Sequence, residues 1–197
     1  MSRLPAGLVA HIVRVRLLAR SLAELHGIDV EACEFGAVCH DLARHLRPEA
    51  LLEEAKNLDI NIDPVERRVP IMLHGPVAAA WLERDREVMD SRVIEAVRYH
   101  TTGKPGISSV TRVVFLADKL EPNKVQRRPG LGEVLHLAKM NIDLALLEHL
   151  NREMMQRIER GDLVHPSTLG LRNELAMSLP QNELVSGEQS PSDKGVG

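Results

Sequence analysis

Apolar residues recur along most of the chain at intervals of three and four positions, the period of an α-helix that buries one face. The clearest stripe lies near the start of the chain and consists of Leu8, Ile12, Val15, Ala19 and Leu22. Gly27 then supplies a stop signal. No segment shows the sustained alternation of apolar and polar residues that is typical of a strand. The pattern therefore predicts an all-α fold.

The same period divides the rest of the chain into further helices, separated by prolines, glycines and polar loops. A second helix is predicted over about 30–43, and one long helix over about 131–160. The stretch 64–70 is predicted to be irregular. Further stripes predict helices that start near Pro48 and Pro76, that include 93–97 and 110–117, and that follow Pro166.

The end of the chain differs in composition from the rest. From Pro180 to Gly197 it reads PQNELVSGEQSPSDKGVG, which is poor in apolar residues and rich in Ser, Gly and Gln. Such a segment cannot bury enough apolar surface to offset the loss of chain entropy. We therefore predict a single helical domain over residues 1–179 and a disordered tail over 180–197.

Composition narrows the classes of function. Aromatic residues make up only 2% of the chain, which favours helices over a sheet. The net charge of −3, from 25 basic and 28 acidic residues, argues against a general nucleic-acid-binding surface. Cys33 and Cys39 cannot form a disulfide framework, and no apolar run approaches the roughly 20 residues of a membrane span. We expect a cytoplasmic protein that binds neither nucleic-acid polymers nor membranes.

Four histidines and two aspartates fall on or beside apolar helix faces. These six residues are His11, His40, Asp41, His74, His100 and Asp118. Taken singly, each histidine is more simply a core side chain bonded to a carbonyl. Taken together, buried imidazoles and carboxylates are costly without a cation, because an unpaired buried carboxylate costs several kcal/mol. The set therefore predicts a site for divalent metal ions.

The order His…His-Asp…Asp resembles the HD-domain metal-dependent phosphohydrolases, which are all-helical. The flanking text is more specific than the order. AHIVRV, AVCHDLAR, LHGPVAA, RYHTTGKPG and VVFLADKLEPNK together resemble the YqeK-type subfamily of symmetrical bis(5'-nucleosyl)-tetraphosphatases. The strong part of the resemblance spans about residues 8–124, and HPSTLGLRN at 165–173 continues it weakly. It implies an HD-domain helical bundle that hydrolyses diadenosine tetraphosphate to two ADP.

The resemblance also implies roles for the six residues. His11, His40, Asp41 and Asp118 would be the core metal ligands, and His74 and His100 would complete a second metal position. Asp41 and Asp118 would be the catalytic carboxylates, with Asp41 shared between metals about 3.5–4 Å apart and a metal-activated hydroxide attacking phosphorus. The family is associated with iron. From first principles, imidazole and carboxylate ligands suit Fe, Mn and Zn equally, as one ion or two.

A tetraphosphate needs further cations and donors beyond the metals. The expected substrate-binding residues are Arg44, Thr101, Thr102, Gly103, Lys104 and Lys124. Without the resemblance, the loop at 101–106 is a turn with an exposed lysine, and Arg44 is a solvated charge at a helix end. Glu121 is predicted either to orient a ligand or bond a ribose, or to lie at the surface. Many relatives carry a basic residue where this chain has Leu8, which leaves the detailed phosphate contacts open.

Histidines outside the set receive simpler interpretations. His45, His136 and His149 lie among polar residues and are predicted to be solvated. His165 is placed near the pocket by the C-terminal signature. Arg172 either closes over a nucleotide or lies at the surface.

Two alternatives stay open at this point. One is another HD-superfamily nucleotidase or phosphodiesterase, against which the loop HTTGKPG and the ADKLEPN stretch argue. The other is a non-catalytic helical binding module with a structural metal. Six ligands and basic loops favour an open catalytic site over a closed structural one. The sequence leaves the oligomeric state open, and exposed positions of the helix predicted over 131–160 are candidates for pairing in a homodimer.

Overall fold

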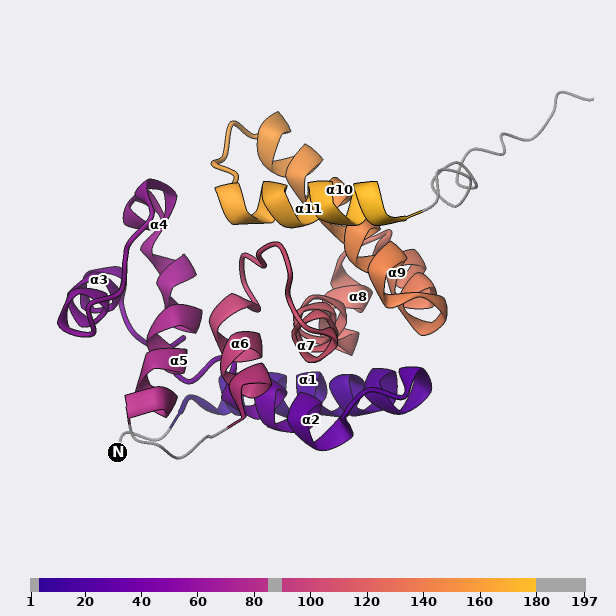
Figure 1. Ribbon diagram of the computed structural model, residues 1–197, viewed down its shortest axis with the longest axis horizontal. Helices are drawn as coiled ribbons and strands as arrows, with labels where there is room; N and C mark the ends of the chain where they lie inside the picture. Colours follow the sequence, from indigo (N-terminus) through magenta and orange to yellow (C-terminus); the bar gives the residue numbers. More distant parts are fainter. Residues whose placement is uncertain (1–3, 85–89, 180–197) are drawn as a thin grey trace, which may run out of the picture.

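The computed structural model describes residues 4–84 and 90–179. Over these ranges the chain forms α-helices and one short 3-10 helix, without a strand (Figure 1). The predicted all-α fold is confirmed. The tail predicted over 180–197 lies outside the described residues.

The helices follow one another with short connections and largely match the apolar stripes of the sequence. In chain order they are α1 (Ala6–His26), α2 (Val30–Cys39), α3 (Pro48–Asn57), α4 (Pro64–Arg68), the 3-10 helix η1 (Pro70–Leu73), α5 (His74–Arg84), α6 (Ser91–Tyr99), α7 (Ser109–Leu120), α8 (Pro122–Arg127), α9 (Leu131–Met140), α10 (Ile142–Glu159) and α11 (Pro166–Ser178).

Helix α7 is the centre of the core. It packs against α1, α2 and α6 on one side and against α9 and α10 on the other (Figure 1). Most of its residues are buried, including Val113, Val114 and Leu116. A side chain of one carbon at Gly36 would lie 3.1 Å from Val114 Cγ2, so the absence of a side chain lets α2 approach α7 closely.

The prediction of one long helix over 131–160 is wrong. The chain breaks at Asn141, which has an extended backbone and caps α10 by accepting the N–H groups of Asp143 and Leu144 at 3.0 and 3.1 Å. An asparagine side chain competes well for free N–H groups at a helix start, so one residue divides the apolar stripe into α9 and α10. A homodimer that pairs through this region stays a prediction.

Two other boundaries differ from the prediction. Helix α2 ends at Cys39 instead of continuing to residue 43, and the chain passes into turns. The stretch 64–70, predicted to be irregular, contains α4 and the start of η1. Helix α4 begins with a capping box. The Asp63 side chain accepts the backbone N–H of Glu66, and the Glu66 side chain accepts the backbone N–H of Asp63.

None of the helices in the described ranges is long and apolar enough to cross a membrane.

Candidate metal centre

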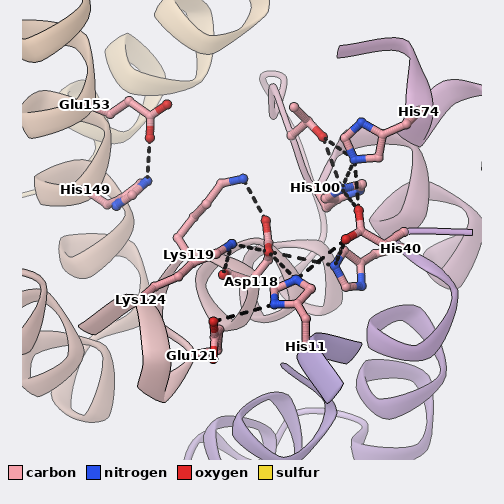
Figure 2. A network of polar contacts seen from close by, with 12 residues as sticks. His11, His40, His74, His100, Asp118, Lys119, Glu121, Lys124, His149 and Glu153 are labelled. Carbon is pink, nitrogen blue, oxygen red and sulfur yellow. Dashed lines mark hydrogen bonds and ion pairs between the residues drawn. The ribbon is translucent and has the colours of Figure 1, made fainter. Parts of the chain in front are cut away.

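Helix ends and two helix interiors bring the six predicted side chains together, and Figure 2 labels all of them except Asp41. Their positions are His11 within α1, His40 as the C-cap of α2 with Asp41 next to it, His74 as the first residue of α5, His100 as the C-cap of α6, and Asp118 within α7. Gly75 allows the start of α5 to lie against the end of α6, because a side chain there would meet the Val97 carbonyl at 2.9 Å.

Three of these histidines are oriented by the same local contact. In each, Nδ1 lies within hydrogen-bonding distance of the carbonyl oxygen three residues earlier, as seen for His40 with Ala37 at 2.7 Å, His74 with Ile71 at 2.5 Å, and His100 with Val97 at 2.8 Å. A carbonyl oxygen only accepts, so Nδ1 carries the proton. The Nε2 atom of each neutral ring then holds a lone pair directed away from its own helix.

These lone pairs face one another. His74 Nε2 lies 2.9 Å from His100 Nε2, and 3.1 Å from Asp41 Oδ1. His40 Nε2 is buried without a hydrogen-bond partner in the described part of the chain and lies 3.4 Å from Asp41 Oδ2. Two acceptor nitrogens at 2.9 Å repel unless a cation lies between them. This donor set therefore fits a divalent metal ion.

The carboxylate of Asp41 divides its two oxygens between two groups of imidazoles. Its Oδ1 lies 3.1 Å from His74 Nε2 and 3.7 Å from His100 Nε2. Its Oδ2 lies 3.4 Å from His40 Nε2 and 3.6 Å from His11 Nε2. A carboxylate placed in this way can serve two metal positions at once.

The second group is completed by Asp118. Its Oδ1 lies 3.1 Å from His11 Nε2 and 3.8 Å from His40 Nε2. The ligand atoms of His11, His40 and Asp118 lie within 4.8 Å of one another, as do those of His40, Asp41 and His100. His40 thus belongs to both groups of candidate ligands.

The protonation states suit metal ligands. Burial raises the pKa of Asp41, but its close contacts with the imidazoles of His40 and His74 outweigh burial and hold this pKa far below its usual range. Burial and the neighbouring imidazoles lower the pKa of His100 well below 6.5. At neutral pH the site therefore presents an ionised carboxylate beside a neutral imidazole, the forms that bind metals.

Two lysines hold Asp118 from the other side. Lys119 Nζ donates to Asp118 Oδ2 at 2.8 Å, and Lys124 Nζ donates to Asp118 Oδ1 and to its backbone oxygen, both at 2.7 Å. Despite burial, the charge of Lys119 and the contacts with His11 and Lys124 keep the pKa of Asp118 well below its usual range. Both ammonium groups line the same cavity as the candidate ligands.

Glu121 lies behind His11 (Figure 2). It is 2% exposed, so the surface position among its predicted alternatives is wrong. Its Oε1 lies 3.6 Å from His11 Nδ1, its Oε2 accepts from Arg14 Nε, and the Asn123 N–H also donates to it. Burial opposes ionisation, but the hydrogen bond from Arg14 lowers the pKa of Glu121, so a negative charge faces the His11 ring from the side opposite Asp118.

The candidate ligands open into a cavity of about 490 Å³. Arg44, Thr101 and Lys124 line it, together with Leu8 at the position where a basic residue was expected. The Thr101 hydroxyl lies 3.1 Å from His100 Nε2.

The rest of the 101–106 loop turns away from this cavity. The Thr102 carbonyl accepts from the Thr168 hydroxyl at 2.7 Å. Gly103 has φ +62° and lies against Leu171, where a side chain of one carbon would come within 2.4 Å of Cδ2. Lys104 Nζ lies 5.0 Å above the Tyr99 ring. Thr102, Gly103 and Lys104 are thus placed next to α11 and α6, and of the predicted loop residues Thr101 alone lines the cavity.

Among the other histidines, the prediction for His149 is wrong. It is 5% exposed, with Nε2 lying 3.2 Å from Glu153 Oε2 and its ring packed against Phe115. The polar residues next to His149 in the sequence predicted an exposed position. The structure buries His149 because the face of α10 that carries it packs against α7. His45 and His136 are exposed, as predicted. His165 is buried, and it lines a different cavity.

Known proteins are similar to this chain over most of its length. The model of the HD domain family matches residues 8–123. The chain is 32% identical over 185 residues to the symmetrical bis(5'-nucleosyl)-tetraphosphatase of Bacillus subtilis, covering 90% of this chain and 89% of that protein. It is 29% identical to the protein of the same name from Halalkalibacterium halodurans, covering 85% and 88% of the two chains.

A solved structure has the same fold. The crystal structure of a predicted HD superfamily hydrolase involved in NAD metabolism, from Clostridium acetobutylicum, superposes with a TM-score of 0.84 at 26% identity. The match covers 88% of this chain and 91% of that one. With the family model spanning residues 8–123 and six candidate ligands in one cluster, five of which line one cavity, this chain belongs to the HD domain family.

Proposed function

We propose that this protein is a metal-dependent phosphohydrolase that splits diadenosine tetraphosphate symmetrically into two ADP. The observation that carries the proposal is Asp41, whose two oxygens face two groups of imidazole Nε2 atoms beside an open cavity. The names of the relatives supply the substrate class. The proposal places the activity in the cytoplasm, and a homodimer remains a prediction.

The proposed ligands are the six side chains already described: His11, His40, Asp41, His74, His100 and Asp118. When bound, one or two divalent ions would supply a nucleophile from water and neutralise charge on the phosphate oxygens. Imidazole and carboxylate donors suit iron, manganese and zinc, and iron is the expectation that the family resemblance adds.

The chain's own cations complete the polyphosphate site. Lys119 and Lys124 lie at the same cavity as Asp118, and Arg44 lines it from the turn after α2. A tetraphosphate carries several negative charges, and ammonium and guanidinium groups bind phosphate oxygens strongly. We propose that these three residues bind phosphates, with the Thr101 hydroxyl as a donor close to the candidate ligands.

Asp41 and Asp118 are the proposed catalytic carboxylates. Both have pKa values far below the usual range despite burial, so both stay ionised at neutral pH. A polyphosphate also binds divalent metal ions, and the negative charge of the two carboxylates would keep these ions on the protein. Thr102, Gly103 and Lys104 do not line this cavity, so the proposed phosphate site does not include them.

Product analysis tests this proposal. Purified, metal-loaded protein incubated with diadenosine tetraphosphate is expected to yield ADP as the main product. AMP with ATP, or no hydrolysis, would contradict the symmetrical cut. Activity that survives Asp118→Ala would contradict the assigned site. A panel of nucleoside monophosphates, triphosphates and cyclic nucleotides separates this function from other HD-type nucleotidases and phosphodiesterases.

A further inference from the structure

A cavity of about 340 Å³ is lined by the C-terminal ends of α8 and α10 and by residues that follow them. Four arginines line it, and we refer to it as the arginine cavity. They are Arg127 in the last turn of α8, Arg128 as its C-cap, Arg157 in the last turn of α10, and Arg160 as its C-cap. The other lining residues are Pro129, Glu153, Gln156 and Asp162.

The position of these arginines at helix ends explains only part of the arrangement. A basic residue at the C-terminal end of a helix is favourable because it offsets the partial negative charge of the last carbonyl groups. That preference does not require the ends of two helices to direct their arginines into one cavity. Guanidinium groups gathered in this way repel one another unless an anion lies among them. The arrangement therefore suits a negatively charged ligand.

The protein itself neutralises one of the four guanidinium groups. Arg157 Nη2 donates to Glu153 Oε1 at 2.7 Å, and Glu153 Oε2 lies 3.2 Å from His149 Nε2, as Figure 2 shows. Both oxygens of this carboxylate are thus in use. The other three arginines are exposed and have no side-chain hydrogen bond or ion pair among the described residues. Asp162 is the remaining carboxylate of the lining, so the cavity keeps a positive charge.

The composition of the lining indicates which anion fits. Guanidinium groups bind phosphate oxygens through paired, charge-assisted hydrogen bonds. Three such groups suit a ligand with more than one phosphate. Among the described residues of the lining, Pro129 alone is apolar, and no aromatic ring offers a surface for a base. The cavity therefore favours a bare chain of phosphates over a nucleoside.

The arginine cavity is distinct from the metal cavity. As described, the two linings have no residue in common. The short helix α8 contributes to both, because Lys124 lines the metal cavity and Arg127, about one turn further on, lines the arginine cavity. The described lining of the arginine cavity contains no histidine, and its Glu153 is already paired. An anion can thus bind there through guanidinium groups without a metal ion.

We propose that the arginine cavity is a second anion site, which binds a free oligophosphate of two or three phosphate groups. The inference does not rest on the proposed function, since it uses none of the candidate metal ligands. The same phosphate chain occurs in inorganic oligophosphates and in nucleotides. Because the lining recognises the phosphates alone, a nucleoside attached to the chain adds no affinity.

Two double variants test the site by binding. Arg128→Ala/Arg160→Ala removes two of the guanidinium groups. Arg67→Ala/Arg68→Ala is the matched control, because it removes two exposed arginines at the end of α4 that line neither cavity and changes the net charge equally. Equilibrium dialysis of metal-loaded protein with labelled pyrophosphate measures binding. We expect one pyrophosphate per chain to bind roughly 100-fold more weakly to the first variant, about tenfold for each guanidinium, and the control to equal the wild type.

Modification of wild-type arginines by phenylglyoxal, read by peptide mass spectrometry, locates the site even if a variant does not fold. Pyrophosphate and triphosphate are expected to slow modification of Arg128 and Arg160 but not of Arg67 and Arg68, and ADP is expected to protect no better than pyrophosphate. Equal protection of all four arginines, or unchanged pyrophosphate binding by Arg128→Ala/Arg160→Ala, would overturn the inference. Stronger protection by ADP or by single-stranded RNA at equal phosphate concentration would also overturn it.

Discussion

At the scale of single residues, the centre depends on how each imidazole is held. His40, His74 and His100 direct Nδ1 at a carbonyl of their own helical turn, so orientation and tautomer are fixed before any ligand arrives. A rigid donor set loses little entropy when it binds an ion, which favours affinity. The four imidazoles are then joined through one carboxylate, Asp41.

Replacing Asp41 by Asn tests this central carboxylate. The volume is kept, but the negative charge shared by the two groups of imidazoles is removed. We expect the metal content per chain to fall and the rate of ADP release to drop by at least about 100-fold. Loss of a residue that only supports a metal ligand already costs about 10- to 100-fold, and Asp41 is proposed to be a ligand itself. Elemental analysis and product assay measure the two effects. Asp143→Asn, which breaks the ion pair between Asp143 on α10 and Arg112 on α7, is the control, and equal metal content in both variants would argue against the role of Asp41.

Glu121 is predicted to act through His11 rather than on the substrate. Glu121→Gln keeps the shape and removes the charge that faces His11 Nδ1. We expect metal affinity to fall roughly tenfold, the usual effect of losing a carboxylate behind a histidine ligand. Metal titration of the metal-free protein measures this, with the exposed Glu133→Gln as control. A loss of stability without a change in metal affinity would show that Glu121 is only structural.

At the scale of elements, the apolar period predicted most helices because each must bury one face. It could not predict the break at Asn141, where a single capping side chain interrupts a continuous stripe. The start of α4 did carry a readable signal, since Asp63-Pro64 followed by Glu66 forms a capping box. Helix ends matter here because His40, His74 and His100 all lie at them.

The cap at Asn141 is expected to contribute measurably to the free energy of unfolding. Asn141→Ala leaves the first N–H groups of α10 without their acceptor, and we expect the free energy of unfolding to fall by about 1 kcal/mol. Asn141→Ser restores an acceptor and should recover most of this loss. Chemical denaturation measures both variants. If the alanine and serine variants are equally stable, the break between α9 and α10 has another cause.

Glu153 joins α10 to α7 through its charge. The contact with the His149 imidazole is the largest influence on its pKa, and together with the charge of Lys119 it outweighs burial and lowers this pKa well below 4.5. A carboxyl with a lowered pKa stabilises the fold above its unfolded pKa, and the gain is lost as pH falls through the folded value. We therefore expect Glu153→Gln to cost about 1 kcal/mol of stability at pH 7 and progressively less below about pH 4. Denaturation as a function of pH measures the difference, and a constant difference would contradict this account.

At the scale of the whole molecule, α7 lies at the centre of the helices (Figure 1). This position lets segments from residue 11 to residue 118 reach one cavity. The six candidate ligands could be predicted from the sequence because they fall on or beside the apolar faces of the helices. The environment of each ligand was not readable, because the contact of Glu121 with His11 and the placement of Thr102 against Thr168 depend on how helices pack. The net charge of −3 likewise conceals three basic side chains, Arg44, Lys119 and Lys124, that line the metal cavity.

The proposed activity requires that these six side chains hold divalent metal ions. Anomalous diffraction at the iron edge, from crystals of iron-loaded protein with bound ADP, tests this directly. The predicted result is an anomalous peak between the Nε2 atoms of His40, His74 and His100 and the Asp41 carboxylate, with ADP phosphate beside it. A crystal containing bound ADP but no anomalous peak among these side chains, or with the metal elsewhere, would contradict the account.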